Sequence, residues 1–185
     1  MLIMACEYSV IPGSIVAIPG IRFAIEVAGP VKALPRPLFM CKTVNGIEKK
    51  WVVNKAMNDQ RRLRQAIEQS LPQNMRGQRI FLPGTPLVLK AKFFHRRGLN
   101  HFVGGKRDVS KIRDEYRNGG VESFMIQKPD LDNCVKFIMD YPLEGLAYDN
   151  DSAVISILAE KSWDDVGECL GRTVIEIVPT YIELG

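Results

Sequence analysis

Two groups of acidic residues stand close together in the second half of the sequence. The first is Lys128-Pro129-Asp130-Leu131-Asp132-Asn133-Cys134-Val135-Lys136, followed by Asp140, and the second is Asp149-Asn150-Asp151. Carboxylate oxygens suit Mg²⁺ or Mn²⁺, and such an ion polarises a phosphoryl oxygen and helps to generate hydroxide from water. A lysine beside the ion can stabilise negative charge that develops on a phosphate. Phosphodiester hydrolysis can be built from these residue types.

A helix over residues 130–140 would have to position the first group. Residues two apart inside a helix point to nearly opposite sides, whereas in extended backbone they point the same way. Asp130 and Asp132 can therefore share one ion most easily if Asp130 lies at the helix entry. Pro129 favours that placement, because it biases Lys128 toward extended backbone and because proline suits a helix start.

Further along the same helix, one polar face is expected. Asp132, Lys136 and Asp140 stand four residues apart, so they share a direction. Asp149 and Asp151 precede a predicted strand over 153–161, and they share a side of the sheet if their backbone is extended. Two neighbouring elements would then supply three carboxylates to one site.

Each of these features also has a plain structural interpretation. Asp130 alone is commonly a helix cap, Asp132–Lys136–Asp140 a surface charge ladder, and Asp149-Asn150-Asp151 a turn. An EF-hand is excluded, since neither acidic group has the required Gly at position six or Glu at position twelve. The sequence also has no Walker A motif and no cysteine spacing typical of zinc sites.

The rest of the chain reads as one domain with a mixed β-sheet and two main helices, of the α/β class or the α+β class. Neither a repeat nor a linker divides the 185 residues, so 1–185 is predicted to be a single domain. Residues 1–20 are expected to be an N-terminal extension or first strand, and 96–120 a long basic loop with a short helix over 109–117. The other predicted elements are a helix over 55–71 and strands over 21–28, 39–43, 50–53, 87–95, 122–127 and 173–178, with Asn45-Gly46 as a hairpin turn.

Charge is distributed very unevenly along this chain. Residues 1–128 carry 22 Lys and Arg against nine Asp and Glu, whereas residues 129–185 carry three against twelve. A basic body with an acidic end suggests a polyanionic partner beside a cation site, although the two parts can also simply neutralise each other. No apolar run reaches the length of a membrane span and no signal peptide is recognised, so an intracellular protein is expected, cytoplasmic or nucleoid-associated, with an organellar or nuclear location left open.

Basic residues outside the acidic groups are candidates for phosphate contacts. His95 and His101 lie in or beside the basic loop and are expected to contact phosphate or to lie on the surface. The four cysteines are expected to be reduced thiols. The candidates for DNA binding are Lys32, Arg36, Arg61, Arg62, Arg64, Arg96, Arg97, Lys106, Arg107 and Lys128.

The acidic groups resemble the RusA family of Holliday junction resolvases, also called crossover junction endodeoxyribonucleases. The family pattern is a basic residue and Pro, then Asp-x-Asp-Asn-x-x-Lys, then Asp four residues on, and later an Asp-Asp pair opening a strand. This sequence has Lys128-Pro129-Asp130-Leu131-Asp132-Asn133-Cys134-Val135-Lys136, Asp140 and Asn150-Asp151-Ser152-Ala153-Val154. The match is strongest over about 128–178. Asn150 stands where the family usually has the first Asp of its pair, and 96–127 is longer than the family pattern.

The resemblance implies a Mg²⁺-dependent homodimer, with Mn²⁺ as a possible substitute, that makes paired nicks in four-way DNA junctions during recombination and repair. By position, Asp130, Asp132 and Asp151 match the family's metal-binding catalytic aspartates and Lys136 its catalytic lysine. Asn133, Asp140 and Asp149 are possible supporting residues.

Two other functions stay open at this point. A protein of the same fold can bind branched DNA without cutting it, although the presence of all four matched residues weighs against this. A structural or assembly protein can also use its acidic end to pair with its basic face.

Overall fold

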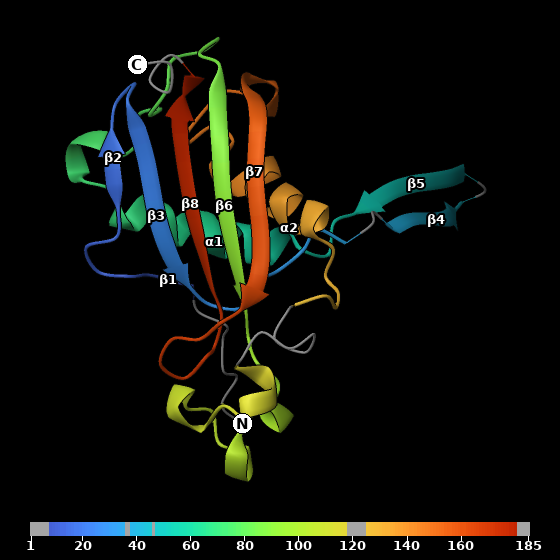
Figure 1. Cartoon of the computed structure of the whole chain (residues 1–185). Coiled ribbons are helices and arrows are strands. Elements are labelled where there is room, and N and C mark those ends of the chain that lie inside the picture. The colour runs from blue at the N-terminus through green and yellow to red at the C-terminus, as the bar shows by residue number, and fades with distance from the viewer. Residues whose placement is uncertain (1–7, 36–37, 46, 118–124, 181–185) are drawn as a thin grey trace.

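The computed structural model describes residues 8–35, 38–45, 47–117 and 125–180. In these residues the main sheet has the strand order β1-β3-β8-β6-β7, and β2 adds to the outer side of β3 (Figure 1). These strands are β1 (Ser9–Val10), β2 (Val16–Ile18), β3 (Arg22–Ala28), β6 (Leu87–His95), β7 (Val154–Trp163) and β8 (Arg172–Pro179). The first twenty residues thus include two short strands, and residues 1–7 lie outside the described part.

The sheet is mixed, as predicted. Strands β6 and β7 pair in parallel, whereas β8 pairs antiparallel with both β3 and β6. Consequently β3, β6 and β7 run in one direction, and their carboxyl ends meet at the same edge of the sheet (Figure 1). A parallel pair needs a crossover connection, and here the helix α2 (Leu131–Ile138) lies in that connection.

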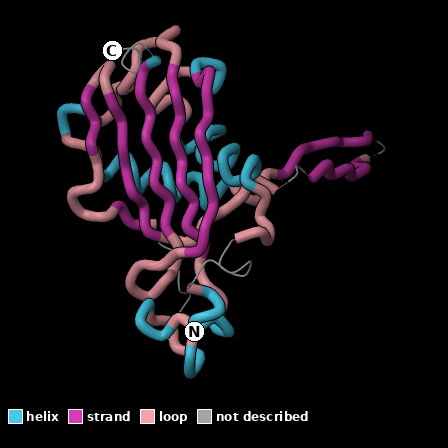
Figure 2. The backbone as a smooth tube through the Cα atoms, in the orientation of Figure 1, coloured by secondary structure: helices cyan, strands magenta, loops and turns pink. Residues whose placement is uncertain are grey.

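Helices α1 (Met57–Ser70) and α2 cover one face of the sheet (Figures 1 and 2). Alternation along β3 explains this arrangement, because Phe23, Ile25 and Val27 are buried while the residues between them are not. Leu63 and Ile67 of α1 and Phe137 of α2 join the same core. The opposite face of the sheet carries ion pairs, among them Arg22–Glu176 at 2.7 Å and Lys92–Glu160 at 2.8 Å.

A polar contact joins the two helices within the core. The buried Gln60 of α1 donates from Nε2 to the carbonyl oxygen of Phe137, at 3.0 Å. Helix α1 ends at Ser70, and Leu71 has extended backbone because Pro72 follows it. The predicted helix over 55–71 and the predicted helix over 130–140 are both present, within a few residues at their ends.

A two-stranded hairpin extends from the body of the molecule (Figure 2). It consists of β4 (Leu38–Val44) and β5 (Ile47–Val53), and the pairing of Val44 with Ile47 leaves a two-residue turn. Asn45 has a φ of +52°, a conformation that asparagine tolerates and that tight hairpin turns require. The predicted hairpin around Asn45-Gly46 is therefore confirmed, although Gly46 itself lies outside the described residues.

Residues 96–117, which we call the insert, do not form a loop with one helix over 109–117. They form four short 3₁₀ turns around a small core of Phe102, Ile112 and Cys169, against which Tyr116 packs. The turn residues Ile112 and Arg113 are extended, so the predicted helix is broken there. The turns are η2 (Leu99–His101), η3 (Val103–Gly105), η4 (Val109–Lys111) and η5 (Asp114–Tyr116).

The insert is held to the loop between β7 and β8. The amide of Arg97 donates to the carbonyl oxygen of Cys169 at 3.3 Å, and the amide of Val109 donates to that of Gly167 at 3.0 Å. After the insert, residues 125–127 are not in a strand, so this part of the predicted strand over 122–127 is wrong. Residues 122–124 lie outside the described part.

Candidate functional site

Asp130 lies at the entry to α2, as its sequence context predicted. It is the N-cap residue with extended backbone, and its carbonyl oxygen accepts the amide of Cys134 at 3.2 Å. Asp132 follows in the first turn. Both carboxylates lie near the buried Cys134 thiol. Burial is the main cause that raises the pKa of Cys134 to about 11, and Asp132 and Asp130 add to the rise while Lys161 opposes it.

Lys161 of β7 fixes the backbone that leads into α2. Its ammonium group donates to the carbonyl oxygens of Gln127 at 2.7 Å and Pro129 at 2.8 Å. On the other side, the amide of Leu34 donates to the carbonyl oxygen of Asn133 at 2.9 Å. Sequence reasoning missed Lys161. The signal for Lys161 in the sequence was a lysine within a predicted strand, at a position on the face that the helices cover.

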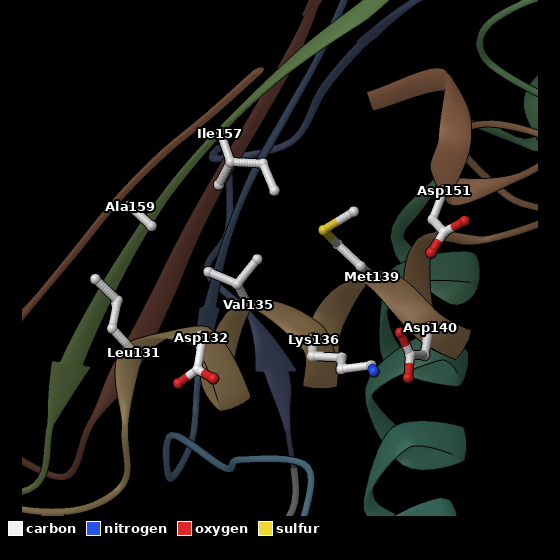
Figure 3. A pocket seen from close by; sticks show the side chains of 9 residues that line it. All are labelled: Leu131, Asp132, Val135, Lys136, Met139, Asp140, Asp151, Ile157 and Ala159. Carbon is white, nitrogen blue, oxygen red and sulfur yellow. The ribbon is translucent and has the colours of Figure 1, made fainter. Parts of the chain in front are cut away.

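A cleft of about 450 Å³ separates α2 from the outer strand β7 (Figure 3). It brings together four of the predicted site residues, namely Asp132, Lys136, Asp140 and Asp151. Leu131, Val135, Met139, Ile157 and Ala159 form its apolar lining. In Figure 3 the Lys136 ammonium extends toward Asp140, Asp151 projects from the chain segment before β7, and Asp132 lies toward the start of α2.

The acidic groups in this cleft influence one another. Burial raises the pKa of the Asp140 carboxyl, the Lys136 ammonium acts in the opposite direction, and the Asp151 carboxylate raises it further. Tyr148 is buried and donates from its hydroxyl to the carbonyl oxygen of Met139 at 3.3 Å. Burial raises the pKa of Tyr148, and the nearby Asp151 adds to that rise. Tyr148, another residue that sequence reasoning missed, is thus an uncharged side chain that holds the backbone at Met139, next to Asp140.

Asp140 is held by a π-helical turn, η7 (Met139–Leu143), that directly follows α2. Pro142 lies inside this turn and removes an amide donor. Arg64 of α1 donates from Nη1 to the carbonyl oxygens of Tyr141 at 3.2 Å and Glu144 at 2.8 Å. Arg64 therefore holds the turn that carries Asp140, rather than presenting its guanidinium freely to a phosphate.

Asp151 opens the short turn η8 (Asp151–Ala153) just before β7. Asn150 caps this turn, because its Oδ1 accepts the amide of Ser152 at 2.9 Å. Asp149 does not line the cleft, and its carboxylate pairs with Arg79 at 2.7 Å. The asparagine in place of the family's usual aspartate thus positions the turn that presents Asp151.

The carboxylates fit one mode of magnesium binding. In the described part of the chain, no three His, Cys, Asp or Glu side chains gather closely enough to hold a metal ion by themselves. Mg²⁺, however, is commonly bound by one or two carboxylates together with water and substrate phosphate, rather than by a cage of protein ligands. The oxygen donors of Asp132, Asp140 and Asp151 suit this open mode, and Asp130 lies outside the cleft lining.

The predicted DNA-binding residues have different surroundings. Arg61, Arg62, Arg96, Lys106 and Lys128 are exposed, whereas Arg107 is half-buried and donates from Nε to the carbonyl oxygen of Arg97 at 3.3 Å. Lys32 pairs with Asp59 at 3.4 Å. Arg36 lies outside the described residues.

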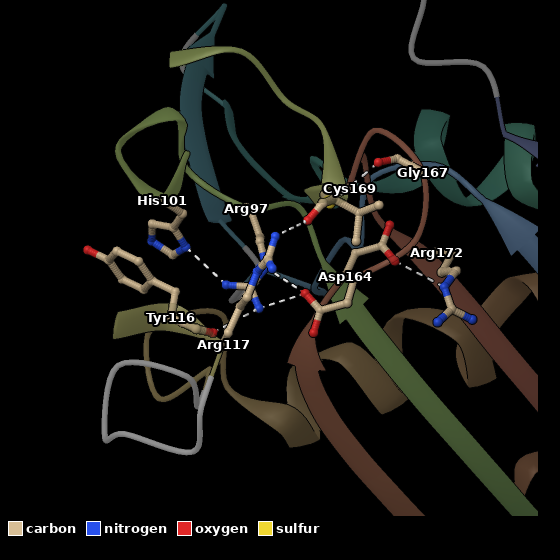
Figure 4. A network of polar contacts seen from close by, with 10 residues as sticks. Arg97, His101, Tyr116, Arg117, Asp164, Gly167, Cys169 and Arg172 are labelled. Carbon is tan, nitrogen blue, oxygen red and sulfur yellow. Dashed lines mark hydrogen bonds and ion pairs between the residues drawn. The ribbon is translucent and has the colours of Figure 1, made fainter. Parts of the chain in front are cut away.

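Arg97 and the two histidines lie in the interior, which differs from their predicted surface roles. Only 2% of Arg97 is exposed, and its guanidinium contacts Asp165 at 2.6 Å. It also contacts His101 Nδ1 at 3.3 Å (Figure 4). His101 stacks on Tyr116 with ring centroids 4.0 Å apart. His95 is 6% exposed, and burial lowers its pKa to about 4, with Lys161 adding to the effect. The prediction that the histidines are surface residues is therefore wrong, whereas a contact with phosphate stays a prediction.

A mixed sheet with a lysine and several aspartates in a cleft at its outer strand is an arrangement suited to phosphodiester chemistry. The family model described as Endodeoxyribonuclease RusA matches residues 30–178. The chain belongs to this family of endodeoxyribonucleases, which resolve Holliday junctions, so the resemblance seen in the sequence is confirmed. No curated protein matches the chain. Within the described residues, no helix is long and apolar enough to cross a membrane.

Proposed function

We propose that this protein cuts four-way DNA junctions by metal-dependent hydrolysis in the cleft between α2 and β7. The observation that carries the proposal is that Asp132, Lys136 and Asp151, from two separate parts of the chain, line one cleft. Sequence spacing alone allowed Asp132 and Lys136 to belong to a surface charge ladder and Asp151 to belong to a turn. Their common position in a cleft supports a joint chemical role.

Mg²⁺ is the proposed cofactor, and Mn²⁺ is expected to substitute for it. Asp132 and Asp151 are the proposed ligands inside the cleft, with Asp130 at the helix entry as the third. A bound divalent cation polarises the phosphoryl oxygens of the scissile phosphate and lowers the pKa of water. Because two or three carboxylates leave much of the coordination to water and phosphate, DNA binding is expected to strengthen metal binding.

Lys136 and Asp140 have complementary proposed roles. The Lys136 ammonium stabilises negative charge that develops on the phosphate or on the leaving oxygen. Asp140 lies one helical turn further along the chain and attracts this ammonium group, which keeps Lys136 directed into the cleft. Asp140 is therefore proposed as a positioning residue, and Asn150 has the same kind of role toward Asp151.

Exposed basic side chains are the proposed contacts for the DNA backbone. Arg61 and Arg62 lie on α1, Arg96 and Lys106 on the insert, and Lys128 just before the acidic motif. Such contacts fix the position of DNA without reading its sequence. Affinity is expected to fall steeply with salt, because each neutralised phosphate releases counterions.

A homodimer is proposed because paired nicks require two active sites. The outer strand β7 supports this assembly: it ends the described sheet, and its side chains include Ile155 and Leu158, which are 64% and 59% exposed. An uncovered apolar edge strand is a template for pairing with another chain. Antiparallel pairing of β7 with its own copy would satisfy the two-fold symmetry that most homodimers have.

The test is incubation of the protein with a labelled synthetic four-way junction in Mg²⁺ or in EDTA, beside a linear duplex. Metal-dependent paired nicks in the junction, absent from Asp132→Asn, are the expected result. Lys92→Gln is a suitable control variant, because Lys92 lies on the opposite face of the sheet and pairs with Glu160. Equal cutting of the junction and the linear duplex would support metal-dependent hydrolysis but would reject a preference for junctions.

A second candidate function is junction binding without cutting. It is favoured by one observation, that no three metal-ligating side chains converge among the described residues. Tight and junction-selective binding without nicks in Mg²⁺ or Mn²⁺ would support this function instead of the nuclease.

A further inference from the structure

A second cavity, of about 390 Å³, lies at the carboxyl ends of β6 and β7. His95 and Trp163 end these two strands and pair in register. Pro30 and Val31, which follow β3, line another side of the cavity. Strands β3, β6 and β7 run in the same direction and end at one edge of the sheet (Figure 1). Residues at or just after their ends line the cavity. In open sheets covered by helices, ligands commonly bind outside such carboxyl ends.

Two buried polar atoms at this cavity have no hydrogen-bond partner in the described structure. They are Nε2 of His95 and Nε1 of Trp163, on side chains that are only 6% and 8% exposed. Buried polar atoms in proteins almost always have a partner, so an exception calls for an explanation. The indole N–H can only donate, whereas a neutral imidazole donates from one nitrogen and accepts at the other. A ligand that enters the cavity far enough to reach both rings, and that has both donors and acceptors, would satisfy both atoms.

The rim of the same cavity is basic. Arg96 and Lys128 line it and are exposed, and the side-chain amides of Asn100 and Gln127 line it as well. A simple anion would use the two cations but would leave the imidazole acceptor unused. A nucleotide fits the whole set, because it combines a phosphate with a planar base that carries donors and acceptors.

The cavity is also close to the proposed active site. Along β7, Ala159 lines the cleft, Lys161 anchors the segment before α2, and Trp163 lines the second cavity. Side chains two apart on a strand share one face, so all three face the helices. Ala159 and Trp163 are four residues apart, which corresponds to about 13 Å at roughly 3.3 Å per residue. One DNA strand can therefore occupy both places.

We propose that this cavity holds one unstacked base of the DNA substrate, while Arg96 and Lys128 contact the adjoining phosphate. This inference rests on the proposed function, since it takes a DNA junction as the substrate. Removing a base from the stack costs least where the base is already unpaired, as at a branch point that opens. His95 is well suited to this task, because its low pKa keeps the imidazole neutral and able to accept a hydrogen bond.

The location of the base can be tested by photo-crosslinking in EDTA, where binding is measured without cutting. Junctions carry 5-iododeoxyuridine at single positions within a few nucleotides of the branch point, and crosslinked peptides are identified by mass spectrometry. We expect one position to crosslink to the peptides that contain His95 or Trp163. Crosslinks confined to other surfaces of the protein would overturn the inference.

The energetic test replaces the same nucleotide by an abasic analogue. Loss of one or two hydrogen bonds should weaken junction binding by the wild-type protein about fivefold to tenfold. Trp163→Phe, which keeps an aromatic ring and removes only the indole N–H, should lose part of this sensitivity. Lys128→Gln, at an exposed position, should weaken binding, whereas the matched control Lys92→Gln should not.

The outcomes separate the two proposals. If the protein cuts junctions normally but no abasic position affects binding, the base-binding cavity is rejected and the nuclease stands. If the junction is crosslinked at the cavity but is never cut, the cavity stands and the nuclease is rejected. A protein that binds no DNA would overturn both.

Discussion

The cleft and the insert both carry charged side chains, yet they are built in different ways. In the cleft, helix α2 presents Asp132 and Lys136, and the turn before β7 presents Asp151, around an apolar lining. In the insert, short turns enclose Arg97. Its guanidinium contacts Asp165, His101 and the carbonyl oxygen of Tyr116. Charge in the cleft is therefore available for chemistry, whereas much of the charge in the insert stabilises the fold.

This difference shows that the number of basic residues in a segment does not measure its capacity to bind phosphate. Arg96 and Arg97 are neighbours in a basic segment, but only Arg96 is exposed. Both residues follow the end of β6, and contacts with Asp165 and His101 hold only the Arg97 side chain in the interior. The burial of one arginine and the exposure of the next could not be read from composition.

The largest expected effect concerns the lysine of the cleft. Lys136→Ala should reduce the single-turnover rate of junction cutting about 10²–10³-fold, as expected for loss of one group that stabilises transition-state charge. Its stability should be unchanged, because Lys136 is exposed. Rapid-quench kinetics and chemical denaturation measure the two quantities. A fall in stability with no fall in rate would remove the distinction between cleft and insert.

Substitution in the insert should have the opposite profile. Arg97→Ala should lower the free energy of unfolding by about 2–4 kcal/mol, because it leaves polar partners unpaired and opens a void. Arg96→Ala, at the adjacent exposed position, should change it by no more than about 0.5 kcal/mol. Urea denaturation of both variants makes the comparison. Equal effects would show that Arg97 is not the centre of the insert.

A comparison of Arg96 with Arg107, another arginine of the insert, tests the view of DNA binding. Arg96→Gln should reduce the slope of log affinity against log salt by about 1, the value for one lost phosphate contact. Arg107→Gln should have a smaller effect, because its guanidinium already donates to a backbone carbonyl. Titration of a labelled junction at several salt concentrations gives both slopes, and identical slopes for the two variants would argue against this assignment.

The smallest effect is a pH dependence of stability from Asp140. Its pKa is raised in the folded protein, mainly by burial, so the folded state binds more protons than the unfolded state and stability falls as pH rises through this range. Asp140→Asn should therefore be more stable than the wild type at pH 7, by less than about 1 kcal/mol since the group is only partly buried. The advantage should disappear below about pH 3.9, the ordinary pKa of Asp. Denaturation at both pH values tests the sign.

Much of the fold and part of the site followed from local patterns in the sequence. Alternation along 21–28 and 87–95 located two central strands, Asn45-Gly46 located the hairpin, and Pro129 with Asp130 located the start of α2. These signals depend on neighbouring residues only. The four-residue spacing of Asp132, Lys136 and Asp140 likewise placed them on one side of a helix, where they line the cleft.

The features that escaped prediction depend on contacts distant in sequence. Arg97 is buried because Asp165, 68 residues later, pairs with it. Lys161 donates a hydrogen bond to the carbonyl oxygen of Pro129, 32 residues earlier. Arg64 was predicted to contact DNA, yet its hydrogen bonds to Tyr141 and Glu144 hold the turn of Asp140. No periodicity within one segment reports such pairings.

The central claim is that DNA cutting depends on the carboxylates that line the cleft, and not on acidic residues in general. Asp151→Asn and Asp149→Asn test it most directly, because the two positions are two residues apart and only Asp151 lines the cleft. On a labelled four-way junction in Mg²⁺, the Asp151→Asn variant should bind normally and fail to cut. Asp149→Asn should cut at nearly the wild-type rate, having lost only an exposed ion pair with Arg79. Equal cutting by both variants, or equal loss in both, would contradict the account.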